Sequence, residues 1–423
     1  MIKEEILTEW NPWWRAYKYE KVERNLLKKV TPWIKRKEIV AIVGARRSGK
    51  TTLLFEIIAK LIADGIDKKN ILFIKCDDER VKEQQLIDTV MQQYLQLINP
   101  SGKVYVFIDE IQEVDVWQKT LKRLYDLTDY KFFISGSNAG ILKEELTSAI
   151  AGRFCYFEMY PFSFAEMLIA KGVSTKKFDV LANKNVTLHH LNEYLEYGGF
   201  PEVVLEKDRN MKQELLRYYL DSIIYRDVVR RAKIRNVKKL EDVVSFFLQN
   251  VSNYANFTKL AKHVGLTTDS VVEYAKRLED AYLIFAVSIH AYSLKKQFIN
   301  PKKMYCVDTG LRNLGFRFSE DAGRLAECVV FVELKRRGKE IYYWKNRHET
   351  DFTIKEGKRV TGAFQVCWDM NEETRPREVE GLKESMTEFK LKEGTILTRD
   401  YEAEEKIEGG RICFVPIWKW LLE

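Results

Sequence analysis

The stretch GARRSGKTT at residues 44–52 decides the expected fold of the first part of the chain. It matches G-x-x-x-x-G-K-[ST], and it lies where a predicted strand ends and a predicted helix begins, as a phosphate-binding loop requires. Gly44 and Gly49 allow the backbone to wrap closely, so that its N–H groups face phosphate oxygens. Lys50 would then reach the β- and γ-phosphates of a nucleotide, and the hydroxyl of Thr51 would bind Mg²⁺. The simpler alternative is a glycine-rich turn at the end of a strand.

Short apolar runs alternate with helical spacing on both sides of this loop. The runs are rich in β-branched and aromatic residues, which is typical of strands buried on both faces. The expected strands are 38–44, 70–76, 104–109 and 131–135, and the expected helices are 51–64, 80–98 and 115–129. Strands that alternate with helices predict an α/β fold with a parallel sheet. The loop residues expected to contact a nucleotide are Gly44, Ala45, Arg46, Arg47, Ser48, Gly49, Lys50, Thr51 and Thr52.

Two acids end the apolar run VYVFIDEIQ at residues 104–112. Asp109 at the strand tip would hold Mg²⁺ through water, and Glu110 would polarise the attacking water as a general base. The alternative is a pair of acids that interact with the amino end of a following helix. A phosphate loop about 60 residues upstream in a βαβ pattern favours nucleotide hydrolysis.

The next predicted strand ends in SGSN at residues 135–138. Ser137 or Asn138 at this tip would orient the water or touch the γ-phosphate. Ser, Gly and Asn are also common turn residues, so a plain turn is the alternative.

Composition limits the class of protein. The chain has 423 residues, which predicts two to four domains, and 46% of them are hydrophobic, enough for several cores. Lys and Arg number 70 against 62 Asp and Glu, a net charge of +8 that permits nucleic-acid binding without demonstrating it. The six cysteines form no CxxC pair, and the sequence MIKEEILTEW carries acids where a signal peptide needs an apolar run. We therefore expect a reduced, soluble, cytoplasmic protein.

The motifs together resemble an AAA-type ATPase family of archaea and bacteria, distant kin of initiator and STAND ATPases. The resemblance rests on GARRSGKTTLL, FIDEIQEVDVWQ, ISGSNAGIL, AGRF, YPFSFAEM and YGGFPEVV, and on the stretch from YRDVVRR to DTGL. It implies ATP and Mg²⁺ as ligands, the sensor 1 role for Ser137 or Asn138, and a ring-forming homo-oligomer, for which a hexamer is one option. Arg153 in AGRF would be either an arginine finger for a neighbouring copy or a structural ion-pair partner.

The same resemblance implies a P-loop ATPase core followed by a helical linker, a winged helix and a domain that resembles PD-(D/E)xK restriction endonucleases. The expected boundaries are 1–160, 161–249, 250–312 and 313–423.

The residues at 255–280 predict a helix-turn-helix by themselves. Gly265 would turn the chain, and Thr267 or Thr268 would cap the second helix. The buried faces are expected to contain Leu260, Ala261, Val264, Val271, Val272, Ala275 and Leu278. The segment SLKKQFINPKK at 293–303 would be the basic wing tip, with Lys295, Lys296, Lys302 and Lys303. Such a fold binds the DNA backbone, and it also serves as a protein-binding module.

Two other segments have open interpretations. The run YRDVVRRAKIRNVKK at 225–239 would contact phosphates, with Arg226, Arg230 and Arg231 among its cations, or would be a solvated helix face. The aromatic residues at 6–20 would pack on the ATPase core in preference to stacking on bases.

The C-terminal region matches a nuclease site only in part. Glu327 and Asp351 match the helix acid and the strand Asp that would gather Mg²⁺. Gln365 and Cys367 stand where a Glu and a Lys are expected, so we predict a degenerate nuclease fold without cleavage activity.

The sequence therefore predicts an ATP-hydrolysing motor or remodeller that acts on DNA, including branched DNA. The alternative is a STAND-like signalling switch whose C-terminal domains bind a protein.

Overall fold

The computed structural model describes residues 2–15, 22–81, 83, 85–138, 140, 152–314 and 321–423. The chain divides into two units, residues 1–159 and residues 160–423, and each is described by itself. The division falls beside the boundary expected at residue 160. The further boundaries expected within the second unit remain predictions.

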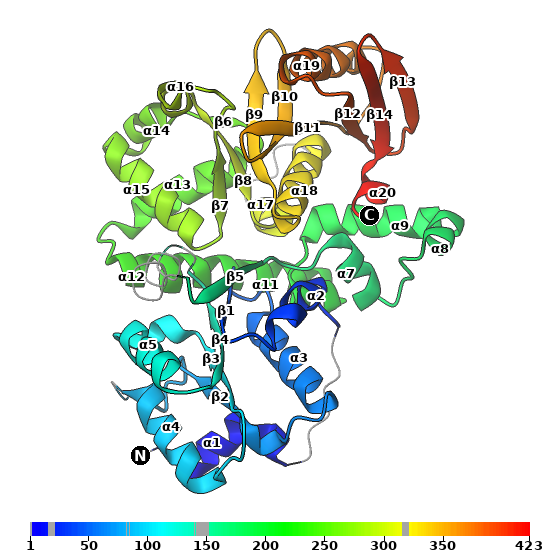
Figure 1. Cartoon of the computed structure of the whole chain (residues 1–423). Coiled ribbons are helices and arrows are strands. Elements are labelled where there is room, and N and C mark those ends of the chain that lie inside the picture. Colours follow the sequence, from blue (N-terminus) through cyan, green and yellow to red (C-terminus); the bar gives the residue numbers. More distant parts are fainter. Residues whose placement is uncertain are drawn as a thin grey trace. The chain divides into compact units, whose positions relative to one another are not determined.

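A five-stranded parallel sheet forms the centre of the first unit, in the order β2-β3-β4-β1-β5 (Figure 1). Its strands are β1 (Ile39–Gly44), β2 (Ile71–Lys75), β3 (Tyr105–Asp109), β4 (Lys131–Gly136) and β5 (Phe154–Met159). The first four confirm the strands expected from sequence, and the parallel α/β class is confirmed with them. Strand β5 was not expected; it lies at the sheet edge and is half-buried, so its sequence lacks the uniformly apolar pattern of its neighbours.

Helices connect the parallel strands, as crossovers in a parallel sheet must. Helices α3 (Lys50–Ala63), α4 (Leu86–Ile98) and α5 (Trp117–Leu127) follow β1, β2 and β3, whereas α1 (Glu4–Trp10) and α2 (Asn25–Val30) precede β1. Strand β4 lies between β1 and β3, so the loop after β1 and the acids after β3 meet at the same end of the sheet.

The N-terminal tryptophans pack on this sheet. Trp13 is fully buried, lies edge-on to Phe55 and Phe73, and donates a hydrogen bond from Nε1 to the carbonyl oxygen of Ile71 at 3.2 Å. Trp14 stacks on Tyr94. These contacts confirm the packing role expected for the aromatic residues that the structure describes; residues 16–21 lie outside the described part.

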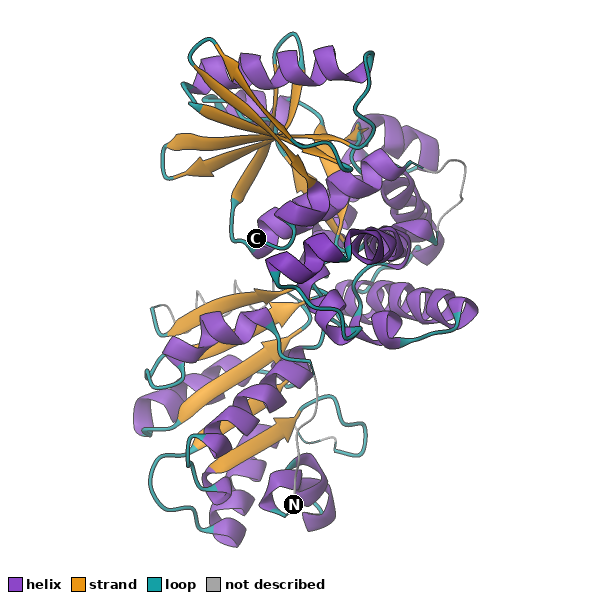
Figure 2. Cartoon of the chain, turned by 90° about the vertical axis from the view of Figure 1, so that its right-hand side faces the viewer, coloured by secondary structure: helices purple, strands orange, loops and turns teal. Residues whose placement is uncertain are grey.

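Helices open the second unit (Figure 2). They are α7 (Phe164–Ala170), α8 (Lys177–Ala182), α9 (Lys184–Tyr197), α10 (Pro201–Leu205), α11 (Arg209–Ser222), the π-helical stretch Ile223–Val229, α12 (Arg230–Ala232) and α13 (Val237–Gln249). The break after α9 has a clear cause. The N–H of Gly199 donates to Asp308 at 2.7 Å, and a Cβ on Gly198 would lie 1.8 Å from the same carboxylate.

A helix-turn-helix and a three-stranded antiparallel sheet follow. Their elements are β6 (Tyr254–Ala255), α14 (Phe257–Val264), α15 (Thr268–Asp280), β7 (Ile284–Val287), α16 (Leu294–Ile299) and β8 (Lys302–Cys306), with strand order β6-β8-β7. Gly265 ends α14 at φ 63°, and the Thr267 side chain caps α15 by accepting the N–H of Ser270. Val271 and Leu278 are fully buried as expected, but Val272 is 47% exposed, so its inward placement was wrong.

The expected basic wing tip differs from the structure. Residues Leu294–Ile299 form helix α16, and only Lys295 and Lys296 of the four lysines are exposed. Lys302 donates to Ser288 Oγ at 2.9 Å and to the Gln297 carbonyl at 2.7 Å, while Lys303 is buried. The four lysines cannot be told apart from the sequence alone, but strand β8 directs the side chains of Lys302 and Lys303 away from solvent.

A six-stranded mixed sheet completes the second unit, in the order β13-β14-β12-β11-β10-β9. Its strands are β9 (Glu340–Lys345), β10 (Glu349–Glu356), β11 (Arg359–Cys367), β12 (Glu393–Thr398), β13 (Ala403–Ile407) and β14 (Gly410–Pro416). The helices are α17 (Thr309–Asn313), α18 (Ala322–Arg336), α19 (Thr374–Phe389) and α20 (Ile417–Trp420). Strands β12, β13 and β14 follow α19 in the chain. Leu382, Ile396 and Phe414 are among the residues of the buried core between α19 and the sheet.

Within the described residues, none of the helices combines the length and the apolar character that crossing a bilayer requires.

Candidate functional site

The loop between β1 and α3 depends on two glycines. A Cβ on Gly44 would lie 2.0 Å from the backbone oxygen of Met159 on β5, so no larger residue fits there. Gly49 has φ 101° and precedes α3, and it has no side chain that could cap the first amides of the helix. Uncapped amides at the start of a helix carry partial positive charge and favour an anion.

The ammonium of Lys50 lies inside this loop. Its Nζ donates to the carbonyl oxygens of Gly44 at 3.1 Å and Ala45 at 3.2 Å, and it lies 3.5 Å from Oε1 of Glu110. The side chain is only 3% exposed. A cation is therefore fixed between the loop and the acids that follow β3.

Thr51 and Asp109 are in direct contact. The Thr51 hydroxyl donates to Oδ2 of Asp109 at 2.7 Å, across 58 residues of sequence. A hydroxyl and a carboxylate are oxygen ligands of the kind that Mg²⁺ prefers. The structure thus brings together the two residues expected to hold the metal.

Ser135 is a site residue that the sequence analysis missed. Its hydroxyl donates to Oδ1 of Asp109 and accepts the backbone N–H of Glu110 at 3.1 Å. The signal was available in the sheet register: Ile108 pairs with Ile134, so the next residue of each parallel strand, Asp109 and Ser135, are neighbours at the sheet end. Ser135 therefore orients both acids.

Burial changes the acidity of Asp109. The carboxyl is fully enclosed, and this burial, together with the adjacent Glu110, raises the pKa of Asp109 to about 6; the hydrogen bonds from Ser135 and Thr51 and the charge of Lys50 oppose the rise. The Asp109 carboxyl accepts the hydrogen bonds of Thr51 and Ser135, as a carboxylate does, and the carboxylate is the form that binds a cation.

Glu110 has an unusual backbone. Its φ of 51° and ψ of 46° lie in the left-handed region, which costs a non-glycine residue about 1–2 kcal/mol. Gln112 donates from Nε2 to Oε2 of Glu110 at 2.5 Å, and Oε1 of Gln112 is buried without a partner among the described residues. The strained backbone thus directs the Glu110 carboxylate toward Lys50 and Gln112, and Gln112 is a second residue that the sequence analysis missed.

Arg24 holds the phosphate loop from outside. Its guanidinium donates to the Ser48 carbonyl at 2.7 Å, and Arg24 is 3% exposed. The Ser48 hydroxyl is buried with no partner in the described structure, so the loop retains an unused hydrogen-bonding group. Arg46, Thr51 and Thr52 are half-buried and Arg47 is exposed at φ 66°. An enclosed cation, the amides at the start of α3 and an unused hydroxyl fit a phosphate group.

Ser137 and Asn138 are buried and directly follow β4, at the same end of the sheet as Asp109. Their role as water-orienting residues remains a prediction.

Arg153 lies at the other end of the strands. It precedes β5, whose first residue pairs with Ile39 at the start of β1, while Gly44 pairs with Met159 beside the loop. Its Nη1 is 3.2 Å from Oδ1 of Asp126 on α5. Within one chain, Arg153 is an ion-pair partner at the sheet end opposite the phosphate loop, and its role toward a neighbouring copy remains a prediction.

In the second unit, Glu327 and Asp351 both contact Lys303. Gln365 accepts the N–H of Asp351 at 3.0 Å and donates to Glu378, so it positions a backbone and a buried acid. Burial raises the pKa of the Cys367 thiol, which keeps it neutral. Neither residue replaces the acid and the cation that a nuclease site needs at these positions.

A second group of possible metal ligands lies on α9. The ligand atoms of His189, His190 and Glu193 lie within 4.8 Å of one another. Glu193, however, already binds the ammonium groups of Lys171 and Lys212 at 2.9 and 2.6 Å. Two cations on the only carboxylate of the group oppose the entry of a third, so these residues fit a structural ion-pair cluster better than a metal site.

Comparisons with known proteins agree with this geometry. Residues 36–168 match the family model described as an AAA domain, and residues 188–321 match a domain of unknown function, DUF8612. The uncharacterized protein MJ1544 of Methanocaldococcus jannaschii is 34% identical over 96% of this chain and 92% of its own length. An uncharacterized protein of Haemophilus influenzae is 31% identical over 90% of this chain and 94% of its own.

Solved structures are more distant. The Aeropyrum pernix ORC1 protein in complex with DNA matches 74% of this chain and 92% of its own, with 11% identity and a TM-score of 0.30. A Saccharomyces cerevisiae Hsp104–ADP complex matches 65% of this chain and 40% of its own, with 15% identity and a TM-score of 0.34. Likeness at this level does not bear on the function of this chain.

The first unit thus has the parallel sheet and phosphate loop of a P-loop NTPase, and the chain belongs to the same AAA-domain protein family as MJ1544 of Methanocaldococcus jannaschii.

Proposed function

We propose that the chain hydrolyses ATP, with Mg²⁺ as cofactor, at the end of the parallel sheet in residues 1–159. The observation that carries this proposal is the set of contacts among Lys50, Thr51, Asp109 and Glu110, which come from sequence positions about 60 residues apart.

Each residue has a distinct task in this reaction. The loop amides and Lys50 would hold the β- and γ-phosphates, since phosphate oxygens are stronger acceptors for an ammonium than the loop carbonyls that it contacts now. Thr51 and Asp109 would hold Mg²⁺, which supplies positive charge to the phosphate oxygens. Glu110 would accept a proton from the attacking water, and its oxygen is close enough to Lys50 to face the terminal phosphate.

Phosphate release with ATP and Mg²⁺ tests this assignment. Lys50→Ala is expected to lower the rate by about 100-fold or more, because a positioned charge partner of the phosphates is removed. Lys60→Ala, on the same helix but half-buried and paired with Asp64, is the matched control and should retain the wild-type rate. An unchanged rate in Lys50→Ala would contradict the site.

DNA is the partner that we propose for the second unit, with branched DNA as the finer possibility. Support comes from the segment around the π-helix and α12, where exposed cations follow one another closely: Arg226, Arg230, Lys233, Arg235 and Lys238. A backbone of phosphates would bind such a surface without base specificity. Arg231 contributes less, because its guanidinium lies 3.6 Å from the buried Asp227.

A signalling switch with a protein partner is the second candidate. It is favoured by α15, the helix that a helix-turn-helix would place against DNA. Its exposed residues include Asp269, Glu273 and Glu279, and Glu273 pairs with Arg277. Such a mixed surface fits a protein better than a phosphate backbone.

ATP turnover with and without duplex, single-stranded and four-way-junction DNA distinguishes the two candidates. The DNA proposal expects stimulation, strongest with the structure that the protein recognises. Turnover that no DNA changes would favour the protein-binding switch.

The oligomeric state is also a proposal, since ring-forming relatives of the AAA type favour a homo-oligomer such as a hexamer. Light scattering with and without ATP would measure it. In such an assembly Arg153 of one copy would act on a neighbouring copy only if its ion pair with Asp126 opened.

A further inference from the structure

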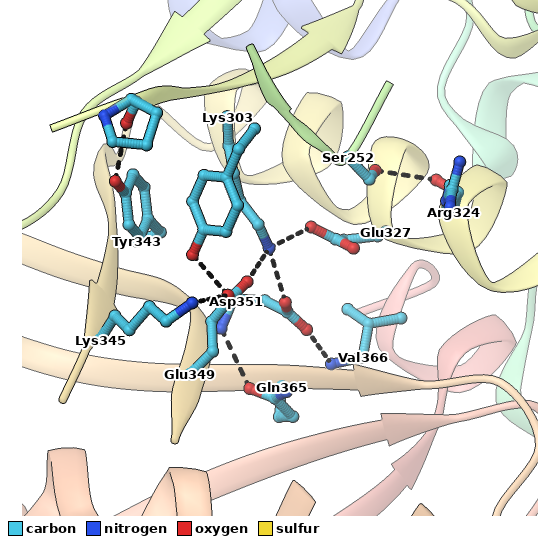
Figure 3. A network of polar contacts seen from close by, with 12 residues as sticks. Ser252, Lys303, Arg324, Glu327, Tyr343, Lys345, Glu349, Asp351, Gln365 and Val366 are labelled. Carbon is cyan, nitrogen blue, oxygen red and sulfur yellow. Dashed lines mark hydrogen bonds and ion pairs between the residues drawn. The ribbon is translucent and has the colours of Figure 1, made fainter. Parts of the chain in front are cut away.

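A buried lysine ammonium sits among three carboxylates in the second unit (Figure 3). Lys303 Nζ on β8 lies 3.0 Å from Oε1 of Glu327 on α18, 2.6 Å from Oε1 of Glu349 and 2.9 Å from Oδ1 of Asp351. Glu349 and Asp351 are two residues apart on β10, so their side chains lie on the same face of the strand. The Lys303 ammonium donates hydrogen bonds to Glu327 and Asp351 and forms an ion pair with Glu349.

Neutral groups also donate hydrogen bonds to each of the three acids. The Tyr305 hydroxyl donates to Glu327 at 2.6 Å, the N–H of Val366 donates to Asp351 at 2.9 Å, and the Tyr254 hydroxyl donates to Glu349. These donors come from three elements of the fold, β6, β8 and β11, whereas the acids themselves lie on α18 and β10. The cluster is therefore a rigid arrangement of oxygen atoms around one cation.

The positive charge in the cluster is smaller than the negative charge. Lys303 is 4% exposed, and among the described residues the other cation in contact with the acids is Lys345, 3.8 Å from Glu349 and half exposed. Burial, and after it the neighbouring Asp351, raises the pKa of the Glu327 carboxyl, while Lys303 and the Tyr305 hydroxyl oppose the rise. Burial lowers the pKa of Lys303, but the three acids outweigh it and raise that pKa well above its usual value, so the lysine keeps its charge.

We propose that Lys303 occupies a divalent-cation site formed by Glu327, Glu349 and Asp351, and that its ammonium keeps metal ions out of this site in the native chain. Three carboxylate oxygens within 2.6–3.0 Å of one central atom form the type of ligand set that Mg²⁺ or Mn²⁺ takes when it can shed water. Loss of the ammonium would leave three acids without their counter-ion and open the site to a metal. This inference does not depend on ATP hydrolysis by the first unit.

The lysine also connects two sheets. It belongs to β8 of the three-stranded sheet, where it pairs with Val287 on β7 and Tyr254 on β6, whereas two of its acids belong to the six-stranded sheet. A partner that displaced β8 would withdraw the cation at the same time. Lys303 therefore couples the position of the three-stranded sheet to the net charge around Glu349 and Asp351 on the six-stranded sheet.

Counting bound Mn²⁺ by electron paramagnetic resonance, without nucleotide, tests the proposal on the full chain. Lys303→Met should bind one Mn²⁺ more per chain than the wild type, and Lys303→Met/Asp351→Asn should lose it again. Lys302→Met is the matched control, because that lysine contacts Ser288 and Gln297 instead of the acids, and it should bind the wild-type number. The phosphate-loop site is common to all variants, so the differences report on the cluster.

Thermal unfolding adds a second readout. Mn²⁺ should raise the midpoint of Lys303→Met more than that of the wild type, because a ligand that binds only the folded state stabilises it. A Lys303→Met chain that folds only when Mn²⁺ is present would support the proposal directly.

Two results would overturn it. One is a Lys303→Met chain that folds and binds no additional Mn²⁺. The other needs no lysine variant: if Asp351→Asn in the otherwise native chain loses a bound Mn²⁺, a metal already sits beside Lys303 and the lysine does not exclude it. Retention of the native Mn²⁺ number in Asp351→Asn is the supporting outcome.

Discussion

Asp109 and Glu110 are adjacent in sequence but have different surroundings. Asp109 receives hydrogen bonds from Thr51 and Ser135 and is enclosed, so both of its oxygens are fixed. Glu110 is turned by its left-handed backbone toward Lys50 and Gln112. One acid is therefore suited to hold a metal with its hydroxyl neighbour, and the other to receive a proton from water.

Ser135→Ala tests this division of labour. The change removes the donor to Asp109 and the acceptor of the Glu110 N–H, so both acids lose their orientation. We expect kcat for ATP to fall by roughly 10- to 100-fold, because small errors in the placement of reacting groups cost about this much. KM for ATP should change less, because the side-chain hydrogen bonds of Ser135 go to Asp109 and Glu110 and not to Lys50 or Thr51 of the phosphate loop.

Steady-state kinetics with circular dichroism as a folding check would measure this. Ser101→Ala, at an exposed loop position, is the control and should retain the wild-type kcat. Equal kcat in Ser135→Ala and the wild type would show that the register contact has no functional role.

The sequence was sufficient to predict the site residues that belong to short motifs. Lys50, Thr51, Asp109 and Glu110 follow from motifs at strand ends, and the structure brings all four together. Arg24, which contacts the loop from a distant segment, has no such motif, because its function depends on tertiary packing alone. Ser135 was within the motif, but the choice between it and Ser137 required the register of β4 against β3.

At the scale of elements, the turn after α9 and the start of α17 form a single connection. Asp308 accepts the N–H of Gly199 at one oxygen and the N–H of Gly310 at the other, at 2.7 and 2.9 Å. Gly310 approaches Tyr197 so closely that a Cβ would lie 2.3 Å from its carbonyl oxygen. The motifs YGGFP and DTGL are therefore explained by one buried contact between two elements about 110 residues apart.

Asp308→Asn should destabilise the chain most at acidic pH. Burial raises the pKa of Asp308 to about 7, although the backbone N–H donors of Gly199, Gly310 and Leu311 oppose the rise. A pKa above the unfolded value means that the folded state holds the proton more tightly, so this contribution to stability is present below about pH 4 and is lost as pH rises through 7. In the Asn variant, an NH₂ group faces one of the backbone N–H donors at every pH. Because two donors cannot bond to each other, the substitution lowers the free energy of unfolding by about 1–3 kcal/mol.

The difference in unfolding free energy between the wild type and Asp308→Asn should therefore shrink from pH 5 to pH 8, because only the wild type loses a proton over this interval. Urea unfolding at the two pH values measures it, with Asp269→Asn at an exposed position as the control. A gap that widens with pH would contradict the burial argument.

Prediction of the secondary structure failed where a strand was only partly buried, and where neighbouring lysines of the same charge differed in their exposure to solvent. Strand β5 is a half-buried edge strand, and Glu158 interrupts its apolar residues. Helix α16 replaced an expected wing tip because LKKQFI has helical as well as wing character, with two exposed lysines and exposed Leu294 and Ile299.

At the scale of the whole molecule, the distribution of exposed cations decides how DNA could bind. Lys302 and Lys303 are occupied within the protein, so phosphate contacts would fall to Lys295, Lys296 and the cations of residues 226–238. The inward turn of Lys303 could not be predicted, because its three acids lie 24 to 48 residues away in sequence.

Lys295→Ala/Lys296→Ala should weaken DNA binding and flatten its salt dependence. Each lost phosphate contact is expected to reduce the log–log salt slope by about 0.9 on duplex DNA, with a similar loss for every base sequence. Fluorescence anisotropy over a salt series measures both. Lys358→Ala/Arg359→Ala removes two adjacent exposed cations from the six-stranded sheet and serves as the matched control. An unchanged slope in the α16 variant would remove this helix from the DNA path.

The central claim is ATP hydrolysis by water that Glu110 activates, and Glu110→Gln tests it most directly. The amide keeps the size of the side chain but cannot take a proton, so the variant should bind ATP with near-native affinity and hydrolyse it at least about 100-fold more slowly. Glu113→Gln, at a nearby exposed acid, should hydrolyse ATP at the wild-type rate. Single-turnover hydrolysis with bound-nucleotide measurement gives both quantities; slow hydrolysis with retained binding is the predicted result, and a wild-type rate in Glu110→Gln would contradict the account.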